Sequence, residues 1–169
     1  VSASAGRRDA GGDTTRTSAG AAERRCTAGL KSWRMESVMR LYELVNQYHV
    51  GTELSCAEAM FQACNEYYQL NLTEETRKMF SIMGIGMQTE QSCCGAFTVA
   101  VVIIGLVTAK KGQRDCDNLD GCKMVYELTE FFAGFFGTLH CAELRRLEMI
   151  GVENPCYALV EEIAKKLEE

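Results

Sequence analysis

Four cysteines of this chain are each predicted at the start of a different helix: Cys56, Cys94, Cys141 and Cys156. Each follows, within one turn, a residue that we expect to cap that helix: Ser55, Ser92, Thr138 and Asn154. The free N–H groups and the positive end of the helix dipole stabilise a negative charge there by about 0.3–1 kcal/mol. A thiol in this position is expected to have a lowered pKa and more thiolate, the form that attacks disulfides or binds metals. These four cysteines are therefore the candidate catalytic residues.

Cysteine is also one of the most frequently buried residues, and it packs as a small hydrophobic side chain. We expect this packing role for Cys64, which falls within a predicted helix, and for Cys93. An interaction protein whose cysteines merely pack is therefore one alternative to a protein with reactive thiols.

The composition narrows the class of protein. The net charge is −5, which argues against nucleic-acid binding. The chain has nine cysteines, and the arginines near its start are not followed by the apolar stretch of a secretory signal. We therefore expect a cytoplasmic, reducing location, where cysteines serve as redox groups or metal ligands more often than as structural disulfides.

Residues 1–34 differ in character from the rest of the chain. They are rich in Ala, Gly, Arg, Ser and Thr, show no periodicity, and carry seven Lys or Arg against three Asp or Glu. We expect a disordered tail, which includes Cys26, from an overlong gene prediction or an added expression segment. Met35 is a candidate natural first residue, and residues 35–169 form the predicted cysteine-containing domain.

The pattern of residues 35–169 predicts an all-α fold, a single-domain bundle of about five to seven helices. Helix starts are indicated by the Ser55–Glu58 capping box, by Thr73, and by Asn154 followed by proline. The segment "GIGM" at 84–87 is expected to interrupt a helix, and a long helix is expected over 119–136. Its phenylalanines, candidates for the core, are Phe131, Phe132, Phe135 and Phe136.

The most apolar segment is "AFTVAVVIIGLVTA" at residues 96–109. It lies in a stretch at the low edge of the length that a membrane-spanning helix needs. We therefore expect a central apolar helix buried in the bundle, from about Ser92 to Lys110, and no membrane span.

Several short segments resemble one protein family. They are "SCAEAMF", "CGAFTVA", "FGTLHCAEL" and "PCYALVEEIAKKL", and together they resemble the redox-active C_GCAxxG_C_C family, named for four separated cysteines and a CGAxxG motif. The resemblance covers about residues 40–167, and it places the family cysteines on Cys56, Cys94, Cys141 and Cys156. One departure is Val99, which stands where the motif has its final glycine and would fill the space beside that turn.

Other kinds of site find little support. The segment "DCDNLDGC" at 115–122 lacks the third acidic residue of a calcium-binding EF-hand, because Leu119 stands there. Cys116 and Cys122 are an exposed loop pair, with an accessory disulfide or metal clip as the alternative. His140 adjoins Cys141 and is expected at the surface or at a helix cap, and no nucleotide-binding glycine motif is present.

Two chemistries fit four gathered thiols. In the first, the chain is a thiol-dependent oxidoreductase that works with a redox partner protein: Cys94 attacks a disulfide, because Gly95 and Ala96 leave its sulfur accessible, and Cys56 or Cys141 resolves the mixed disulfide. In the second, four thiolates hold an iron–sulfur cluster or zinc for electron transfer or binding. Both require residues far apart in the chain to meet in one pocket.

Overall fold

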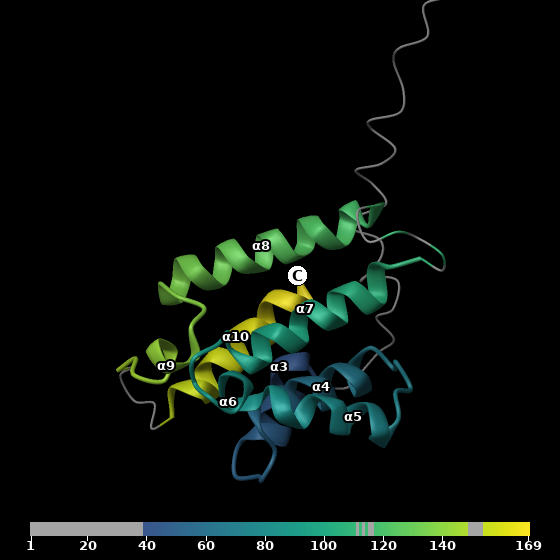
Figure 1. Ribbon diagram of the computed structural model, residues 1–169. Helices are drawn as coiled ribbons and strands as arrows, with labels where there is room; N and C mark the ends of the chain where they lie inside the picture. The colour runs from purple at the N-terminus through teal and green to yellow at the C-terminus, as the bar shows by residue number, and fades with distance from the viewer. Residues whose placement is uncertain (1–38, 111, 113, 115–116, 149–153) are drawn as a thin grey trace, which may run out of the picture.

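The computed structural model describes residues 39–110, 112, 114, 117–148 and 154–169, and in these ranges it is a helical bundle without a strand (Figure 1). The predicted all-α fold is confirmed. The tail, Met35, Cys26 and Cys116 lie outside the described residues. The helices are α3 (Leu41–His49), α4 (Cys56–Tyr67), α5 (Glu74–Phe80), the 3-10 turn η1 (Ser81–Met83), α6 (Gly84–Met87), α7 (Gly95–Thr108), α8 (Leu119–Phe136), α9 (Cys141–Leu144) and α10 (Pro155–Glu168).

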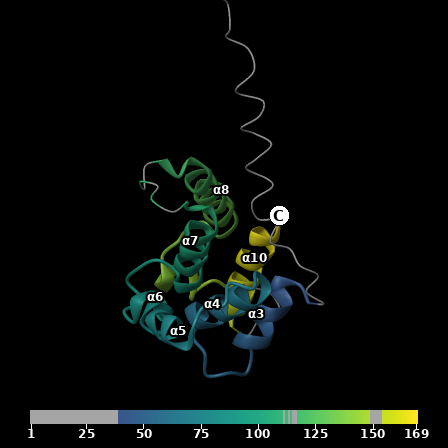
Figure 2. The same cartoon turned by 90° about the vertical axis from the view of Figure 1, so that its right-hand side faces the viewer.

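The longer helices form layers. Figures 1 and 2 show α8 along one side, α7 and α10 in the middle, and α3, α4 and α5 on the other side. The central position of α7 agrees with its sequence, because a helix that is apolar all round must be covered on most sides. Its fully or nearly fully buried side chains include Val99, Ala100, Ile103 and Ile104.

Three of the predicted helix starts are confirmed. The Ser55 side chain accepts a hydrogen bond from the Glu58 amide while the Glu58 side chain reaches back to the Ser55 amide, as a capping box requires. Thr73 caps α5. Asn154 Oδ1 accepts from the Cys156 amide at 3.0 Å at the start of α10.

The two other predicted caps are wrong. Helix α7 begins at Gly95, so that Cys94 itself is the N-cap residue and Ser92 lies before the helix. Helix α9 begins at Cys141 with His140 as its N-cap residue, and Thr138 instead donates a hydrogen bond to Glu143 Oε2 at 2.5 Å. In both places contacts with a distant segment of the chain fix where the helix begins. Such contacts cannot be predicted from a local sequence pattern.

Aromatic rings fill the space between the layers. Phe97 of α7 lies 5.4 Å from Phe132 of α8, measured between ring centroids, and Phe132 lies 4.8 Å from Phe136. Phe132 and Phe136 are buried as predicted, but Phe135 is 60% exposed, so its placement in the core is wrong. It lies on the outer face of α8, which none of the described helices covers at this position.

The beginning of α3 is fixed to the end of α10. Arg40 Nε donates to Glu168 Oε1 at 3.0 Å, and the Leu41 amide donates to the same oxygen at 2.8 Å. Burial alone would raise the pKa of Glu168, but these hydrogen bonds and the Arg40 charge lower it. This contact sets the direction of α3, whose far end carries His49.

Among the described residues, we find no helix that combines the length and apolar character needed to cross a membrane.

Candidate functional site

The four predicted cysteines line one pocket, which has a volume of about 330 Å³. Cys56 comes from the first turn of α4, Cys94 from the residue before α7, Cys141 from the start of α9 and Cys156 from the first turn of α10. Segments that are far apart in the chain thus supply one thiol each. The pocket walls are completed mainly by Leu54, Ile85, Leu144, Leu159 and Val160.

Backbone pairing brings Cys94 and Cys141 to the same place. The Cys94 amide donates to the Leu139 carbonyl at 2.9 Å, and the Cys141 amide donates to the Ser92 carbonyl at 2.9 Å. These bonds make an isolated antiparallel bridge between Cys93 and His140. The starts of α7 and α9 are therefore joined by the main chain and not only by side-chain packing.

A left-handed turn packs against these helix starts. In α6, Ile85 and Gly86 have φ of +53° and +55°, and the turn is closed by a hydrogen bond from the Gln88 amide to the Gly84 carbonyl at 2.9 Å. A Cβ atom on Gly86 would lie 2.6 Å from Cβ of Cys141, closer than such atoms can approach. The expected break at "GIGM" is confirmed, and its second glycine allows the turn to sit directly on Cys141.

The predicted lowering of the thiol pKa values is wrong for three of the four cysteines. Burial raises the pKa of Cys94, although the amides of Phe97 and Ala96 favour its thiolate. Burial also raises the pKa of Cys156, against the opposing charge of Arg145. The cost of removing water from a buried thiolate is larger than the stabilisation that the helix N-terminus gives to its charge. These thiols are therefore protonated at neutral pH.

Cys56 is the neighbour that the other three thiols share. A negative charge on Cys56 raises the pKa of Cys94, of Cys141 and of Cys156, in each case after burial. The effect of a charge falls with distance, and it is strongest where water is excluded. Cys56 therefore lies within electrostatic reach of the other three thiols.

Exposure divides the four thiols into two pairs. Cys94 and Cys141 are only 6% and 5% exposed, whereas Cys56 and Cys156 are half-buried. The expectation that Gly95 leaves the Cys94 sulfur accessible is wrong. A Cβ atom on Gly95 would lie 2.4 Å from the Met83 carbonyl oxygen, so the glycine allows the backbone of 83–84 to cover this turn.

His49 and Arg145 also line the pocket, and neither was predicted there from the sequence. His49 is 8% exposed, its Nδ1 has no hydrogen-bond partner, and its ring meets Tyr157 edge-on at 4.9 Å. Burial lowers the pKa of His49, so it is neutral at pH 7. Arg145 pairs with Glu90 at the rim, and its position four residues after Cys141 was a signal that the two share a helix face.

The remaining described cysteines lie elsewhere. Cys64 is fully buried with Sγ 3.7 Å from Met60 Sδ, which confirms its packing role. Cys93 is half-buried against the core and is not part of the pocket wall, and Cys122 is exposed on α8. All seven cysteines among the described residues are free thiols. His140 is half-buried at the start of α9.

The zinc or iron–sulfur site expected as the alternative for these four cysteines stays a prediction. Within the described ranges, no three His, Cys, Asp or Glu side chains are placed to hold a metal ion. Val99, which replaces the motif glycine, is fully buried in the core, so the space beside that turn is filled by a side chain.

The raised thiol pKa values predict that the folded chain loses stability in alkaline solution. Burial and the charges of Cys56 and Cys156 raise the pKa of Cys141 to about 11. In the unfolded chain the pKa of this thiol is about 8.5. Stability from this difference is complete below the unfolded value and is lost as the pH rises through the folded value. Urea unfolding should therefore give a smaller free energy of unfolding at pH 10.5 than at pH 8.

The matched variants are Cys141→Ala and Cys122→Ala. The first should lose less stability than the wild type over this pH range, by on the order of 1–2 kcal/mol. The second removes an exposed thiol and should follow the wild type. Equal pH dependence in all three proteins would contradict the assignment to Cys141.

Comparison with known proteins agrees with the geometry. Residues 54–169 match the family described as "Putative redox-active protein (C_GCAxxG_C_C)". No curated protein and no solved structure gave a match. The matched range spans more than half of the chain and includes all four cysteines of the pocket. The chain therefore belongs to the C_GCAxxG_C_C family.

Proposed function

We propose that the chain is a thiol-dependent oxidoreductase that exchanges two electrons between its cysteine pocket and a disulfide on a partner protein. The main support for this proposal is that one pocket is lined by all four cysteines, Cys56, Cys94, Cys141 and Cys156. Four thiols from separate segments have no packing reason to share a single cavity. The family description as redox-active supports the same class of chemistry.

Exposure and electrostatics suggest the order of events. Cys56 is half-buried, and its charge affects the pKa of all three other thiols. It is therefore the thiol that reacts first with an incoming disulfide. Cys94 is buried behind it, and the Cys56 charge is the largest charge effect on its pKa. Cys94 is therefore the resolving thiol, and this order reverses the roles expected from sequence.

The proposed reaction is a thiol–disulfide exchange in two steps. The Cys56 thiolate attacks one sulfur of the partner disulfide, and the other partner sulfur leaves as a thiolate. Cys94 then gives up its proton as it attacks the Cys56 sulfur, and the second partner sulfur leaves. Two electrons pass to the partner, the two protons from Cys56 and Cys94 end on its thiols, and a Cys56–Cys94 disulfide remains.

The surface beside the pocket suits a protein partner. Ile85 lines the pocket and is 42% exposed, and Met87 on the same turn is 46% exposed. Apolar side chains gathered around a reactive site are typical of a transient docking surface. The proposal places the protein in a reducing compartment such as the cytoplasm, where a second exchange restores the thiols.

Thiol counting tests the proposal. The folded protein is treated with oxidised glutathione, the remaining thiols are titrated, and the disulfides are located by peptide mass mapping. We expect a loss of about two pocket thiols per chain and a peptide pair that joins Cys56 to Cys94. If every thiol titrates as it did before oxidation, or if only glutathione adducts form, the exchange chemistry is excluded.

A further inference from the structure

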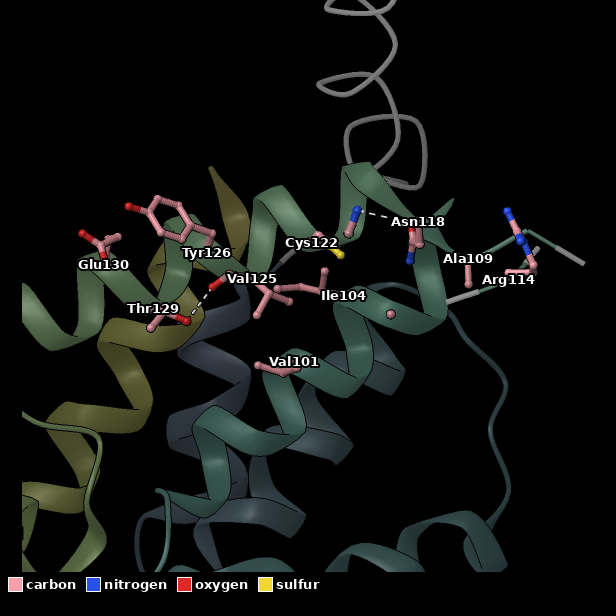
Figure 3. Close-up of a pocket in the computed structure, with 12 residues that line it drawn as sticks. Val101, Ile104, Ala109, Arg114, Asn118, Cys122, Val125, Tyr126, Thr129 and Glu130 are labelled. Carbon is pink, nitrogen blue, oxygen red and sulfur yellow. Dashed lines mark hydrogen bonds between the residues drawn. The ribbon is translucent and has the colours of Figure 1, made fainter. Parts of the chain in front are cut away.

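A second hollow lies away from the cysteine pocket, between α7 and α8. It has a volume of about 650 Å³, and Figure 3 shows it as a groove along the two helices. Val101 and Ile104 of α7 and Val125 of α8 form its floor, and Gly105 leaves open space because nothing lies within 4 Å of where its Cβ would be. The groove has no role in the thiol chemistry.

The apolar surface extends beyond the groove itself. Val102 and Leu106, next to the groove residues on α7, are 40% and 49% exposed. On α8, Leu119 and Tyr126 are 72% and 64% exposed. Large apolar side chains exposed around one groove are a sign of an interaction site. A small molecule in the groove would leave these flanking side chains uncovered, so the occupant is a macromolecule.

The charges at the ends of the groove indicate which macromolecule. Arg114 lies at one end and Glu130 at the other, with Cys122 between them (Figure 3). A two-fold axis through the middle of the groove would place Arg114 of each copy against Glu130 of the other. Surfaces that pair with themselves in this way are characteristic of symmetric dimers.

The contact that Arg114 makes within one chain does not oppose this pairing. Arg114 Nε lies 2.9 Å from Asp117 Oδ2, with the two side chains 78% and 47% exposed. An exposed ion pair contributes about 0–1 kcal/mol. The guanidinium group can therefore turn to a carboxylate of a second copy, or bind both, at little cost.

We propose that the α7–α8 groove is the interface of a two-fold symmetric dimer, with α8 antiparallel to α8 of a second copy. Leu106 and Tyr126 of each copy fill the groove of the other, and the Arg114–Glu130 contacts close both ends. Because Cys122 lies between the two charges, the two Cys122 side chains lie beside the axis. The cysteine pockets stay outside the interface and open to their partner.

Sedimentation velocity of the full chain tests the dimer. We expect twice the chain mass for the wild type at micromolar concentration. Leu106→Glu should raise the dimer dissociation constant at least about tenfold, because a buried carboxylate would be unpaired. Met79→Glu introduces the same charge on α5, at a site that is 67% exposed, and should leave the dimer intact.

Charge reversal tests the symmetry directly. Arg114→Glu and Glu130→Arg should each weaken the dimer, because like charges then meet across the axis. The double variant carries both reversals and should recover most of the wild-type affinity, which a partner other than a second copy would not produce. Treatment with oxidised glutathione, which takes up the two electrons and two protons, should give a covalent dimer that Cys122→Ser abolishes.

Several results would overturn the proposal. They are a monomer throughout the micromolar range, a dimer that Leu106→Glu leaves unchanged, a double charge variant no stronger than the single variants, and a covalent dimer that persists in Cys122→Ser. A monomer that carries a bound lipid in native mass spectra would likewise assign the groove to a small ligand instead. None of these outcomes bears on the thiol pocket, so the two proposals fail separately.

Discussion

A Cys56→Ser variant should lose the reversible oxidation of the thiol pocket, while Cys122→Ser keeps it. The charge of Cys56 affects all three of the other thiols, and without Cys56 the buried Cys94 has no partner in the proposed disulfide. The number of pocket thiols that disappear on treatment with oxidised glutathione, as located by peptide mapping, should fall from about two per chain to none. Titration before and after treatment, with peptide mapping, measures this.

The controls separate chemistry from folding. Cys122 is exposed on α8, so its replacement by serine removes a thiol without touching the pocket. Thermal unfolding should place both variants close to the wild type, because serine at the half-buried position 56 can still hydrogen-bond to water. A Cys56→Ser protein that still oxidises two pocket thiols at the wild-type rate would refute the central role of Cys56.

A Gly95→Ala variant should be strongly destabilised although it adds a single methyl group. The added Cβ would lie 2.4 Å from the Met83 carbonyl oxygen and 3.1 Å from Cα of Gly84. Both atoms belong to the backbone and cannot move aside like the end of a side chain. Forcing extra volume into such a contact costs typically about 1–3 kcal/mol, and we expect the upper end of this range.

Gly134→Ala supplies the matched control for this change. Gly134 lies within α8, and nothing is found within 4 Å of where its Cβ would be. Alanine is a better helix former than glycine, so this variant should gain about 0.5–1 kcal/mol. Urea unfolding of the two variants should therefore give changes of opposite sign. A Gly95→Ala protein as stable as the wild type would contradict the close packing of the 83–84 backbone.

The features of this structure that depend on neighbouring residues could be predicted from the sequence. The capping residues Ser55, Thr73 and Asn154 work through hydrogen bonds to residues only two or three positions away, so their effect can be read from a short stretch. The bounds of α8 follow in the same way from its periodicity and from Gly137, which ends it with φ of +78°.

The predictions that were wrong concern features that depend on distant segments of the chain. Helix α7 starts later than predicted because residues 92–94 pair with residues 139–141, far along the chain. The expected exposure of Cys94 failed because the 83–84 backbone closes over Gly95. The thiol pKa values were expected to fall because helix position is visible in sequence, whereas the burial that raises them is a property of the assembled fold.

The gathering of four thiols was predicted, but their individual environments were not. Their helix-start positions and the family resemblance led to the same four residues, and the fold places them together. His49 was missed because its approach to the pocket depends on where α3 ends relative to α10. A histidine isolated in sequence gives no sign of that distance.

The left-handed turn offers the buried thiols a route to solvent. Ile85, Met87, Gln88 and Glu90 all have positive φ, and each non-glycine residue in this conformation costs about 1–2 kcal/mol. Only contacts with the finished bundle hold the segment in place, so it should detach transiently at a small fraction of the free energy that global unfolding requires. Hydrogen–deuterium exchange should then be faster at residues 85–90 than in α4 or α7, and each such opening would uncover Cys141 while the bundle stays folded.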